Sequence, residues 1–147
     1  MERWGNDFFD RYYKSWWGID AAYEKIAADC DVTYNVMNIL SLLYRHRTPM
    51  PQNELSKELH LSNQTVTSAV DNLEKKGLVT RSIPEDDRRK RIVTLTDEGR
   101  AIGRHVGRTM RQVELAAFAE LSEEEQNALV SIMEKLWHGF SHVLGEE

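Results

Sequence analysis

The sequence has a single cysteine, three prolines and no long apolar run. One cysteine cannot form an internal disulfide, so the fold depends on its core, and a reducing compartment is expected. No apolar stretch approaches the roughly 18 residues that a membrane-spanning helix needs. The opening residues Met-Glu-Arg-Trp-Gly-Asn-Asp also lack the basic and apolar segments of a signal peptide. We therefore expect a cytoplasmic protein with no membrane partner.

The motifs of the common enzyme classes are missing as well. The chain has no phosphate-binding glycine loop, no nucleophile elbow and no paired carboxylates in a defined setting. His138 and His142 are four residues apart, a spacing that allows joint metal ligation, but the residues between them do not form a zinc motif. Packing at a dimer surface is the alternative for these histidines. We expect no catalytic residue, no metal site and no cofactor.

What the chain does have is charge, and the charge is unevenly distributed. Charged residues make up 29% of the 147 residues, and the net charge is −5. Residues 1–42 and 101–147 are acidic, whereas residues 43–100 carry eleven Lys or Arg against nine Asp or Glu. Local charge steers association with nucleic acid, so an acidic total does not exclude DNA as a partner. The basic middle of the chain is where DNA would bind.

The pattern of apolar residues predicts a mainly α-helical fold with one β-hairpin. Helices are expected over the first thirty residues, from Thr33 to about Arg45, from about Gln52 to His60, from Ser62 to Lys76, from Asp97 to about Ala119 and after Ser122. Thr33 and Ser62 are expected to cap their helices, and Ser122 with Glu125 is expected to form a capping box. β-Branched segments at 78–83 and 91–96 flank a polar turn and predict the hairpin. Two short helices joined by a tight turn and followed by a hairpin form a winged helix-turn-helix.

Both ends of the chain carry apolar faces that one small domain cannot bury. Aromatic residues near the N-terminus repeat at a spacing of four, and the last helix has an apolar stripe at spacings of three and four: Phe8, Phe9, Tyr12, Tyr13, Trp16 and Trp17, and Leu129, Ile132, Met133, Leu136, Phe140 and Leu144. We expect a homodimer built from residues 1–32 and 101–147, with the DNA-binding domain at 33–100. The aromatic residues also leave open a pocket for a flat apolar ligand.

The predicted recognition helix, about 62–76, has an unusual outer face. Its apolar residues Val66, Ala69, Val70 and Leu73 lie on one side and face the core. Short uncharged polar residues form its start and its other side: Ser62, Asn63, Gln64, Thr65, Thr67, Ser68 and Asn72. Gln, Asn and Thr can read base edges in the major groove, whereas a solvated helix usually carries Lys and Glu there. A polar helix face is common by itself, so the argument for DNA needs the neighbouring hairpin.

The predicted wing, about 78–96, has four consecutive cations at its tip, Arg88, Arg89, Lys90 and Arg91. Such a finger can neutralise phosphates or enter the minor groove. Asp87 stands two residues before Arg89, where it can hold the guanidinium in one rotamer or form only a weak surface ion pair. A basic finger beside a polar helix predicts binding to double-stranded DNA.

The order of these elements, with several short motifs, resembles the MarR family of bacterial transcription regulators. The motifs are Asp87-x-Arg89 leading into Leu95-Thr96-x-x-Gly99, the run Leu73-Glu74-Lys75-Lys76-Gly77-Leu78-Val79, and Glu54-Leu55 with Leu59 and Leu61-Ser62. The resemblance covers nearly the whole chain. It implies a homodimer whose recognition helices enter the major grooves of an inverted-repeat operator, while a wing-tip arginine reaches the flanking minor groove.

The resemblance also implies regulation by a ligand. Most members of the family repress nearby genes and leave the DNA when a small, often phenolic or lipophilic, effector binds between the dimer and DNA-binding regions. By location, Tyr12, Trp16, Tyr34, Met37 and Arg104 are expected to line that cleft.

Two positions depart from the family pattern. Pro51 stands where the family often has a Thr or Ser cap, so the first helix of the pair has to be capped differently. Cys30 lies too late in the first helix to match the redox-sensing branch of the family. Two alternatives therefore remain beside the ligand-responsive repressor: a metal- or thiol-responsive sensor on the same scaffold, and a dimerisation module that does not bind DNA.

Overall fold

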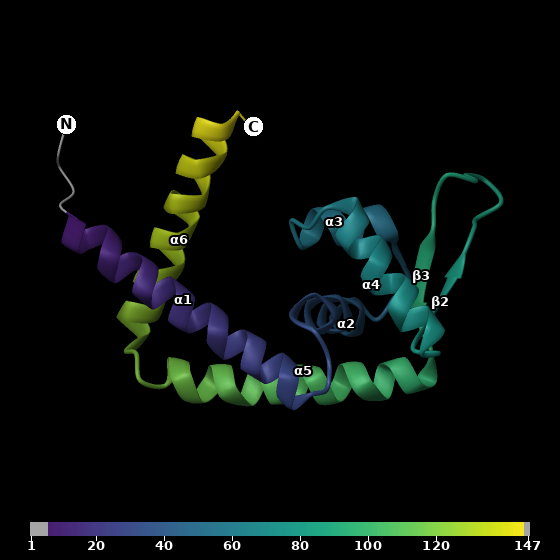
Figure 1. Cartoon of the computed structure of the whole chain (residues 1–147), viewed down its shortest axis with the longest axis horizontal. Coiled ribbons are helices and arrows are strands. Elements are labelled where there is room, and N and C mark those ends of the chain that lie inside the picture. The colour runs from purple at the N-terminus through teal and green to yellow at the C-terminus, as the bar shows by residue number, and fades with distance from the viewer. Residues whose placement is uncertain (1–5, 146–147) are drawn as a thin grey trace. The chain divides into compact units, whose positions relative to one another are not determined.

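The computed structural model describes residues 6–145, with side chains from residue 7 onward. Its elements are α1 (Asn6–Asp29), α2 (Tyr34–His46), β1 (Met50–Pro51), α3 (Gln52–Glu58), α4 (Asn63–Lys75), β2 (Val79–Ser82), β3 (Ile92–Leu95), α5 (Asp97–Phe118) and α6 (Glu123–Leu144) (Figure 1). The predicted mainly helical class with a hairpin wing is confirmed. The segment that bears on a signal peptide lies mostly outside the described residues.

The chain divides into two compact units, one ending at Met110 and the other beginning at Arg111. The first unit holds α1 to β3 and the start of α5, and the second holds the end of α5 and α6. α5 therefore crosses the boundary between them.

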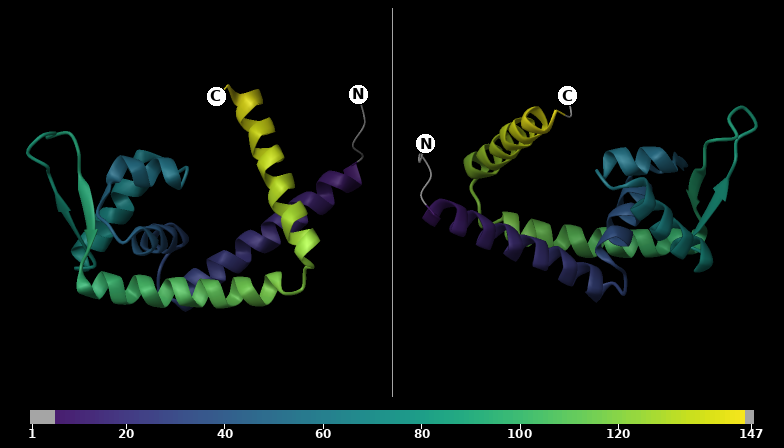
Figure 2. Two further views of the ribbon diagram at one scale, coloured as in Figure 1. Left: turned by 180° about the vertical axis from the view of Figure 1, so that it is seen from behind. Right: turned by 45° about the horizontal axis from the view of Figure 1, so that its top comes forward.

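The wing belongs to a three-stranded antiparallel sheet in the order β1-β3-β2. Strands β2 and β3 pair from Val79 with Leu95 to Ser82 with Ile92, and the loop between them extends away from the helices (Figures 1 and 2). The sequence did not predict β1, whose Pro51 pairs with Ile92. Proline is tolerated on the edge of a sheet, where its missing N–H faces away from the ladder. This short strand leads directly into α3.

Helix α2 lies at the centre of the core. Its residues Met37, Ile39 and Leu40 are fully buried, as the apolar run at 36–43 predicts. Each such side chain stabilises the fold by about 1.5–3 kcal/mol relative to leaving it in water. The predicted cap of this helix is also confirmed, because the Thr33 hydroxyl accepts a hydrogen bond from the Val36 N–H at 3.4 Å.

Helix α1 exposes its aromatic side chains in the single chain. The rings stack along the helix at a spacing of four, with 6.1 Å between the centroids of Phe9 and Tyr13 and 5.7 Å between those of Tyr13 and Trp17. Trp16 is 53% exposed and Trp17 is 66% exposed. The aromatic stripe that the sequence predicts is therefore present and largely uncovered.

The second unit also exposes large apolar side chains, on helix α6. Helix α6 begins with the predicted capping box, in which Ser122 and Glu125 each bond to the other's backbone N–H. None of its described residues is buried. Large apolar side chains lie in water along it: Val130, Ile132, Met133, Leu136, Trp137, Phe140, Val143 and Leu144. The stripe that the sequence expects to be buried is thus exposed within one chain.

The start of α5 approaches the wing so closely that only glycine fits. A Cβ added at Gly99 would overlap the carbonyl oxygen of Leu78. We expect Gly99→Ala to lower the free energy of unfolding by about 1–3 kcal/mol, because backbone has to move to admit the methyl group. Urea denaturation measures the loss.

Gly18→Ala is the matched control for this substitution. A Cβ at Gly18 meets nothing within 4 Å, and the residue lies inside α1. Alanine there should raise the free energy of unfolding by about 0.5–1 kcal/mol through helix propensity. Equal stability of the two variants would contradict the close approach at Gly99.

Candidate nucleic-acid interface

Helix α4 begins at a well-formed cap. The Ser62 hydroxyl accepts from the Thr65 N–H at 3.1 Å, and the two hydroxyl oxygens lie 2.8 Å apart. Ser and Thr are favoured at this position because they satisfy an otherwise unpaired backbone donor. The predicted core face of the helix is confirmed, since Val66, Ala69, Val70 and Leu73 are all buried. The remaining side of α4 therefore faces outward as the sequence predicts.

The outer face of α4 divides into exposed and covered residues. Ser62, Asn63, Gln64, Ser68 and Asn72 are exposed, whereas Thr65 and Thr67 are half-buried. The Gln64 amide donates to the Ser68 hydroxyl at 3.3 Å, which holds these two side chains along the helix. The side chains without net charge are thus the ones available for hydrogen bonds to base edges.

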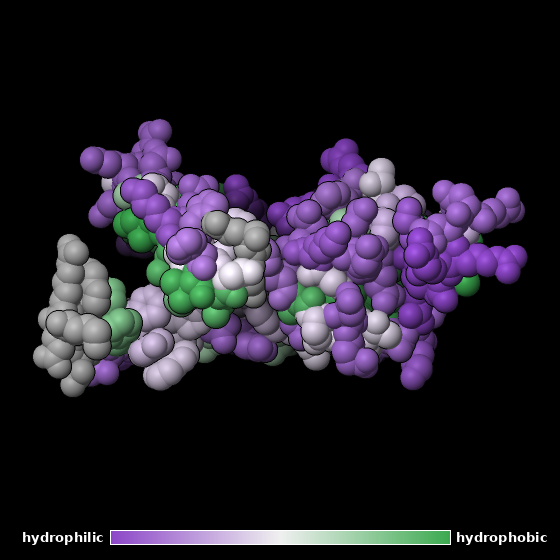
Figure 3. Space-filling view, turned by 90° about the horizontal axis from the view of Figure 1, so that it is seen from above, coloured by the Kyte–Doolittle hydropathy of each residue, from purple (hydrophilic) through white to green (hydrophobic). Residues whose placement is uncertain are grey.

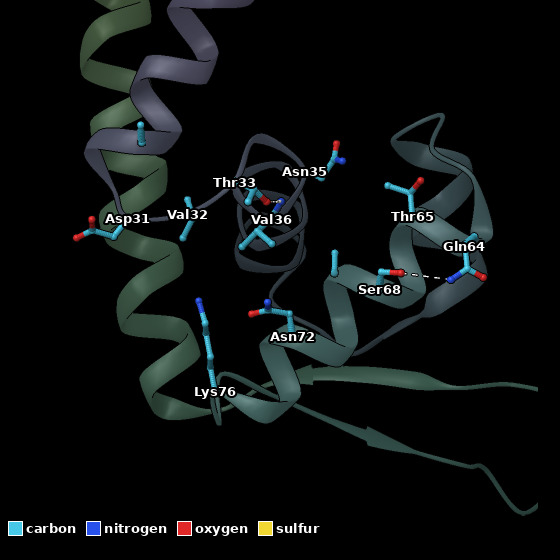
Figure 4. A pocket seen from close by; sticks show the side chains of 12 residues that line it. Asp31, Val32, Thr33, Asn35, Val36, Gln64, Thr65, Ser68, Asn72 and Lys76 are labelled. Atoms are coloured by element: carbon cyan, nitrogen blue, oxygen red, sulfur yellow. Dashed lines mark hydrogen bonds between the residues drawn. The ribbon is translucent and has the colours of Figure 1, made fainter.

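This face borders a groove, which we call the α2–α4 groove. It has a volume of about 730 Å³ and is lined by Ala28, Asp31, Val32, Thr33, Asn35, Val36, Gln64, Thr65, Ser68, Ala69, Asn72 and Lys76. Figure 4 shows the start of α2 on one side of the groove and Gln64, Ser68 and Asn72 on the other. The groove is lined by both polar and apolar residues, and its polar residues from α4 are Gln64, Thr65, Ser68 and Asn72.

The wing tip presents its cations to water. Arg89 is 93% exposed in its side chain, and Asp87 is 23% exposed. The Asp87 carboxylate accepts from the Arg89 N–H at 3.0 Å and from its Nε at 3.3 Å. It also lies 4.0 Å from Lys90 Nζ. The acid therefore shapes the tip, while the guanidinium stays accessible.

Arg91 has a different environment from its neighbours. Its Nη1 donates to the carbonyl oxygens of Arg88 and Lys90 at 2.9 and 3.0 Å, so it braces the backbone of the tip. Arg88 and Arg91 are both exposed. Figure 3 shows hydrophilic side chains dominating the surface at the wing end of the molecule.

A second hollow lies between the wing tip and the beginnings of α3 and α4, and we call it the wing hollow. It has a volume of about 470 Å³ and is lined by Gln52, Asn53, Asn63, Asp87, Arg89, Lys90 and Arg91. Its lining joins residues that are far apart in the sequence, including predicted residues from both the helix and the wing. The structure therefore brings the wing tip and the start of α4 to one place.

Sequence reasoning missed one cation at the base of the wing. Arg81 on β2 donates from Nη2 to Asp71 at 2.6 Å and to Glu74 at 2.7 Å, both on α4. The side-chain hydrogen bond from Arg81 lowers the pKa of Glu74, and the bond to Glu74 raises the pKa of Arg81. Acidic residues seven to ten positions before a strand arginine were the available signal. This cluster fixes the wing to α4.

The five residues expected by location around an effector have different environments in the structure. Met37 is fully buried in the core, and Tyr34 is half-buried with its ring centroid 6.3 Å from that of Tyr23. Tyr12 and Trp16 are in ring contact on α1 at 6.3 Å, whereas Arg104 is exposed on α5. None of the five lines the α2–α4 groove or the wing hollow.

Cys30 and the metal-binding residue types were the candidates for sensing a thiol reagent or a metal. Cys30 is buried in the core, with 9% of its surface exposed. Among residues 6–145, no three His, Cys, Asp or Glu side chains are grouped so that they could hold a metal ion. No described helix is long and apolar enough to cross a membrane.

Relatives of the chain define its class. Residues 32–90 match the sequence model of the MarR family. The HTH-type transcriptional regulator YwhA of Bacillus subtilis is 32% identical over 98 residues, which cover 67% of this chain and 70% of that protein. The regulator PecS of Dickeya dadantii is 31% identical over 117 residues, which cover 78% of this chain and 70% of that protein.

Several solved structures have the same fold. A MarR family regulator from Neisseria meningitidis has a TM-score of 0.79 at 23% identity and covers 93% of this chain and 96% of its own. MepR of S. aureus, solved in complex with DNA, has a TM-score of 0.76 at 22% identity, with 94% and 99% covered. NadR, solved with 4-hydroxyphenylacetate, has a TM-score of 0.72 at 20% identity, with 92% and 95% covered.

The fold and these relatives identify a winged helix-turn-helix, DNA-binding transcription regulator. The chain belongs to the MarR family. Members of this family are transcription regulators and not enzymes.

Proposed function

We propose that this chain represses transcription as a homodimer bound to an inverted-repeat operator, and that a small aromatic or lipophilic effector releases it. The carrying observation is the uncharged polar face of α4 beside a wing whose tip cations are exposed. Such a regulator acts on chromosomal DNA, so we place it in the cytoplasm. The structure of MepR with DNA supports this use of the fold.

The two parts of the interface have different chemistry and so different roles. Uncharged side chains such as Gln64 and Ser68 make directional hydrogen bonds, which suit base edges in the major groove. The cations at the wing tip act through charge, which suits phosphates and the negative potential of a narrow minor groove. We therefore assign sequence recognition mainly to α4 and sequence-independent affinity mainly to the wing.

Replacing one residue from each part tests this division. Lys90→Ala should weaken binding to every duplex alike and reduce the slope of log affinity against log salt by about one unit. Gln64→Ala should cost about 1–3 kcal/mol on the operator and little on random DNA, with the salt slope nearly unchanged. The operator is taken as the duplex that the wild-type chain enriches from a random-sequence library, and titrations at several salt concentrations give the affinities.

Arg89→Ala provides the intermediate case. Its exposed guanidinium, oriented by Asp87, should contribute both charge and a preference for a narrow A·T-rich minor groove. Its loss should lower the affinity for the operator and the affinity for random DNA, with the larger decrease on the operator. The same pattern for Gln64→Ala and Lys90→Ala would reject the assignment of roles.

The homodimer is proposed from the uncovered apolar surface. Helix α6 exposes a continuous series of large apolar residues, and α1 exposes its aromatic stripe. Large contiguous apolar patches on a folded protein mark interaction sites. A second copy of the chain presents the same patch, so a symmetric pair can cover both. Two recognition helices in such a pair would meet half-sites about one helical turn, or ~10 bp, apart.

Leu136→Glu tests this proposal, with Lys135→Glu as the adjacent control. Leu136 belongs to the apolar stripe of α6, and a carboxylate there should prevent close packing with a second copy. We expect light scattering at micromolar concentration to report a dimer for the wild type and for Lys135→Glu, and a monomer for Leu136→Glu. A folded wild-type monomer under these conditions would overturn the homodimer.

The effector is proposed from the aromatic side chains of α1 and the exposed cation Arg104 on α5. An aromatic acid matches both features, and NadR binds 4-hydroxyphenylacetate on the same fold. Met37 is buried in the single chain, so we omit it from the proposed lining and keep Tyr12, Trp16, Tyr34 and Arg104. The metal- or thiol-responsive alternative has less support. Cys30 is in the core, and the described residues include no cluster of His, Cys, Asp or Glu side chains that could hold a metal ion.

A titration with aromatic acids, beginning with 4-hydroxyphenylacetate, tests the effector. Binding should lower the affinity for the enriched duplex by a coupling of about 1–3 kcal/mol, and the duplex should weaken effector binding by the same factor. Calorimetry with and without the duplex measures both directions. An acid that binds tightly without changing DNA affinity would mean that the aromatic stripe only packs against protein.

A further inference from the structure

Gln52, the first residue of α3, bonds to both parts of the candidate interface. Its backbone N–H donates to the carbonyl oxygen of Arg91, at the end of the wing tip, at 2.8 Å. Its side-chain Nε2 donates to the Thr67 hydroxyl on α4 at 2.9 Å. One residue therefore connects the wing directly to the recognition helix.

This connection is partly shielded from solvent. Gln52 and Thr67 are both half-buried, and the Oε1 atom of Gln52 is buried with no hydrogen-bond partner among the described residues. An unpaired buried polar atom is uncommon in a native protein. A hydroxyl can both donate and accept, so either orientation of the amide keeps its bond to Thr67. Because Oε1 has no partner among the described residues, the bond to Thr67 is the one that holds the Gln52 amide in place.

Gln52 also lines the wing hollow, together with Asn63 of α4 and with Asp87 and Arg89 of the tip. A duplex that receives α4 in one groove and the wing in the next needs a set distance between the two. Contacts that already hold this distance reduce the ordering cost of binding. The two bonds of Gln52 fix the end of the wing relative to the middle of α4.

We propose that Gln52 is a positioning residue for operator discrimination, which acts by holding the wing and α4 in register through the Thr67 hydroxyl. The inference rests on the DNA-binding function proposed above. It changes the role of Thr67, whose hydroxyl binds Gln52 and does not read a base.

A double-mutant cycle with Gln52→Met and Thr67→Val tests the proposal. Methionine has a similar length, lacks the amide and keeps the backbone N–H that bonds to Arg91. Each single variant should weaken binding to the enriched duplex by about five- to tenfold, because the duplex then has to order the wing and α4 at a cost similar to that of one hydrogen bond. The double variant should be no weaker than either single one, because both remove the same bond. Binding to random DNA and the salt slope should stay unchanged.

Thr67→Ser is the rescue variant, since it keeps the hydroxyl and loses only the methyl group. It should bind the enriched duplex as the wild type does, and unfolding midpoints should show that all variants are folded. Losses that multiply in the double variant, an unaffected Gln52→Met, or a Thr67→Ser as weak as Thr67→Val would each overturn the proposal. A wild-type chain that enriches no duplex would instead reject the proposed DNA-binding function itself.

Discussion

Thr96 holds both ends of the wing at one point. Its hydroxyl donates to the Gly77 carbonyl oxygen at 2.7 Å and accepts from the Gly99 N–H at 3.0 Å. Its backbone N–H donates to the Leu78 carbonyl oxygen at 3.1 Å. Gly77, with φ of +69°, lets the chain turn out of α4 into β2. The end of the recognition helix, the wing and the start of α5 are therefore fixed by one residue, and the DNA-binding surface depends on it.

The cations of the central region have separate tasks. Arg81 is held between Asp71 and Glu74 at the base of the wing, so its charge is neutralised locally and stabilises the contact of β2 with α4. At the tip, Asp87 faces Arg89 and Lys90 while Arg88 and Arg91 remain exposed. Glu85 and Asp86 precede Asp87 in the same loop and are exposed. An acidic chain can thus present a basic tip, because the four cations at 88–91 are consecutive and outnumber the three acids at 85–87. The acidic flanks also limit non-specific attraction to DNA.

Local sequence patterns predicted most of the fold, because helix caps and apolar periodicity are local signals. The caps at Thr33, Ser62 and Ser122 were each predicted and confirmed. Strand β1 was missed because a two-residue strand has no periodicity. The bonds Gln52–Thr67 and Arg81–Glu74 were missed because each joins separate elements, and spacing along the sequence does not by itself place one element against the other. A helical wheel places Thr67 outward, but it cannot show that α3 covers it.

Helix α5 constrains how a signal can reach the DNA-binding surface. It crosses from the first unit into the second, and its beginning is packed without spare room: a Cβ at Gly103 would lie 3.2 Å from Tyr44 Cβ and 3.4 Å from the Leu40 carbonyl oxygen. The approach of Gly99 to the Leu78 carbonyl oxygen is closer still, so the start of α5 has to move together with α2 and the base of the wing. A tightly packed core resists continuous deformation. Under the proposed function, an effector that releases the operator must therefore change the distance between the two DNA-binding domains of the homodimer. The fold of each DNA-binding domain stays as it is.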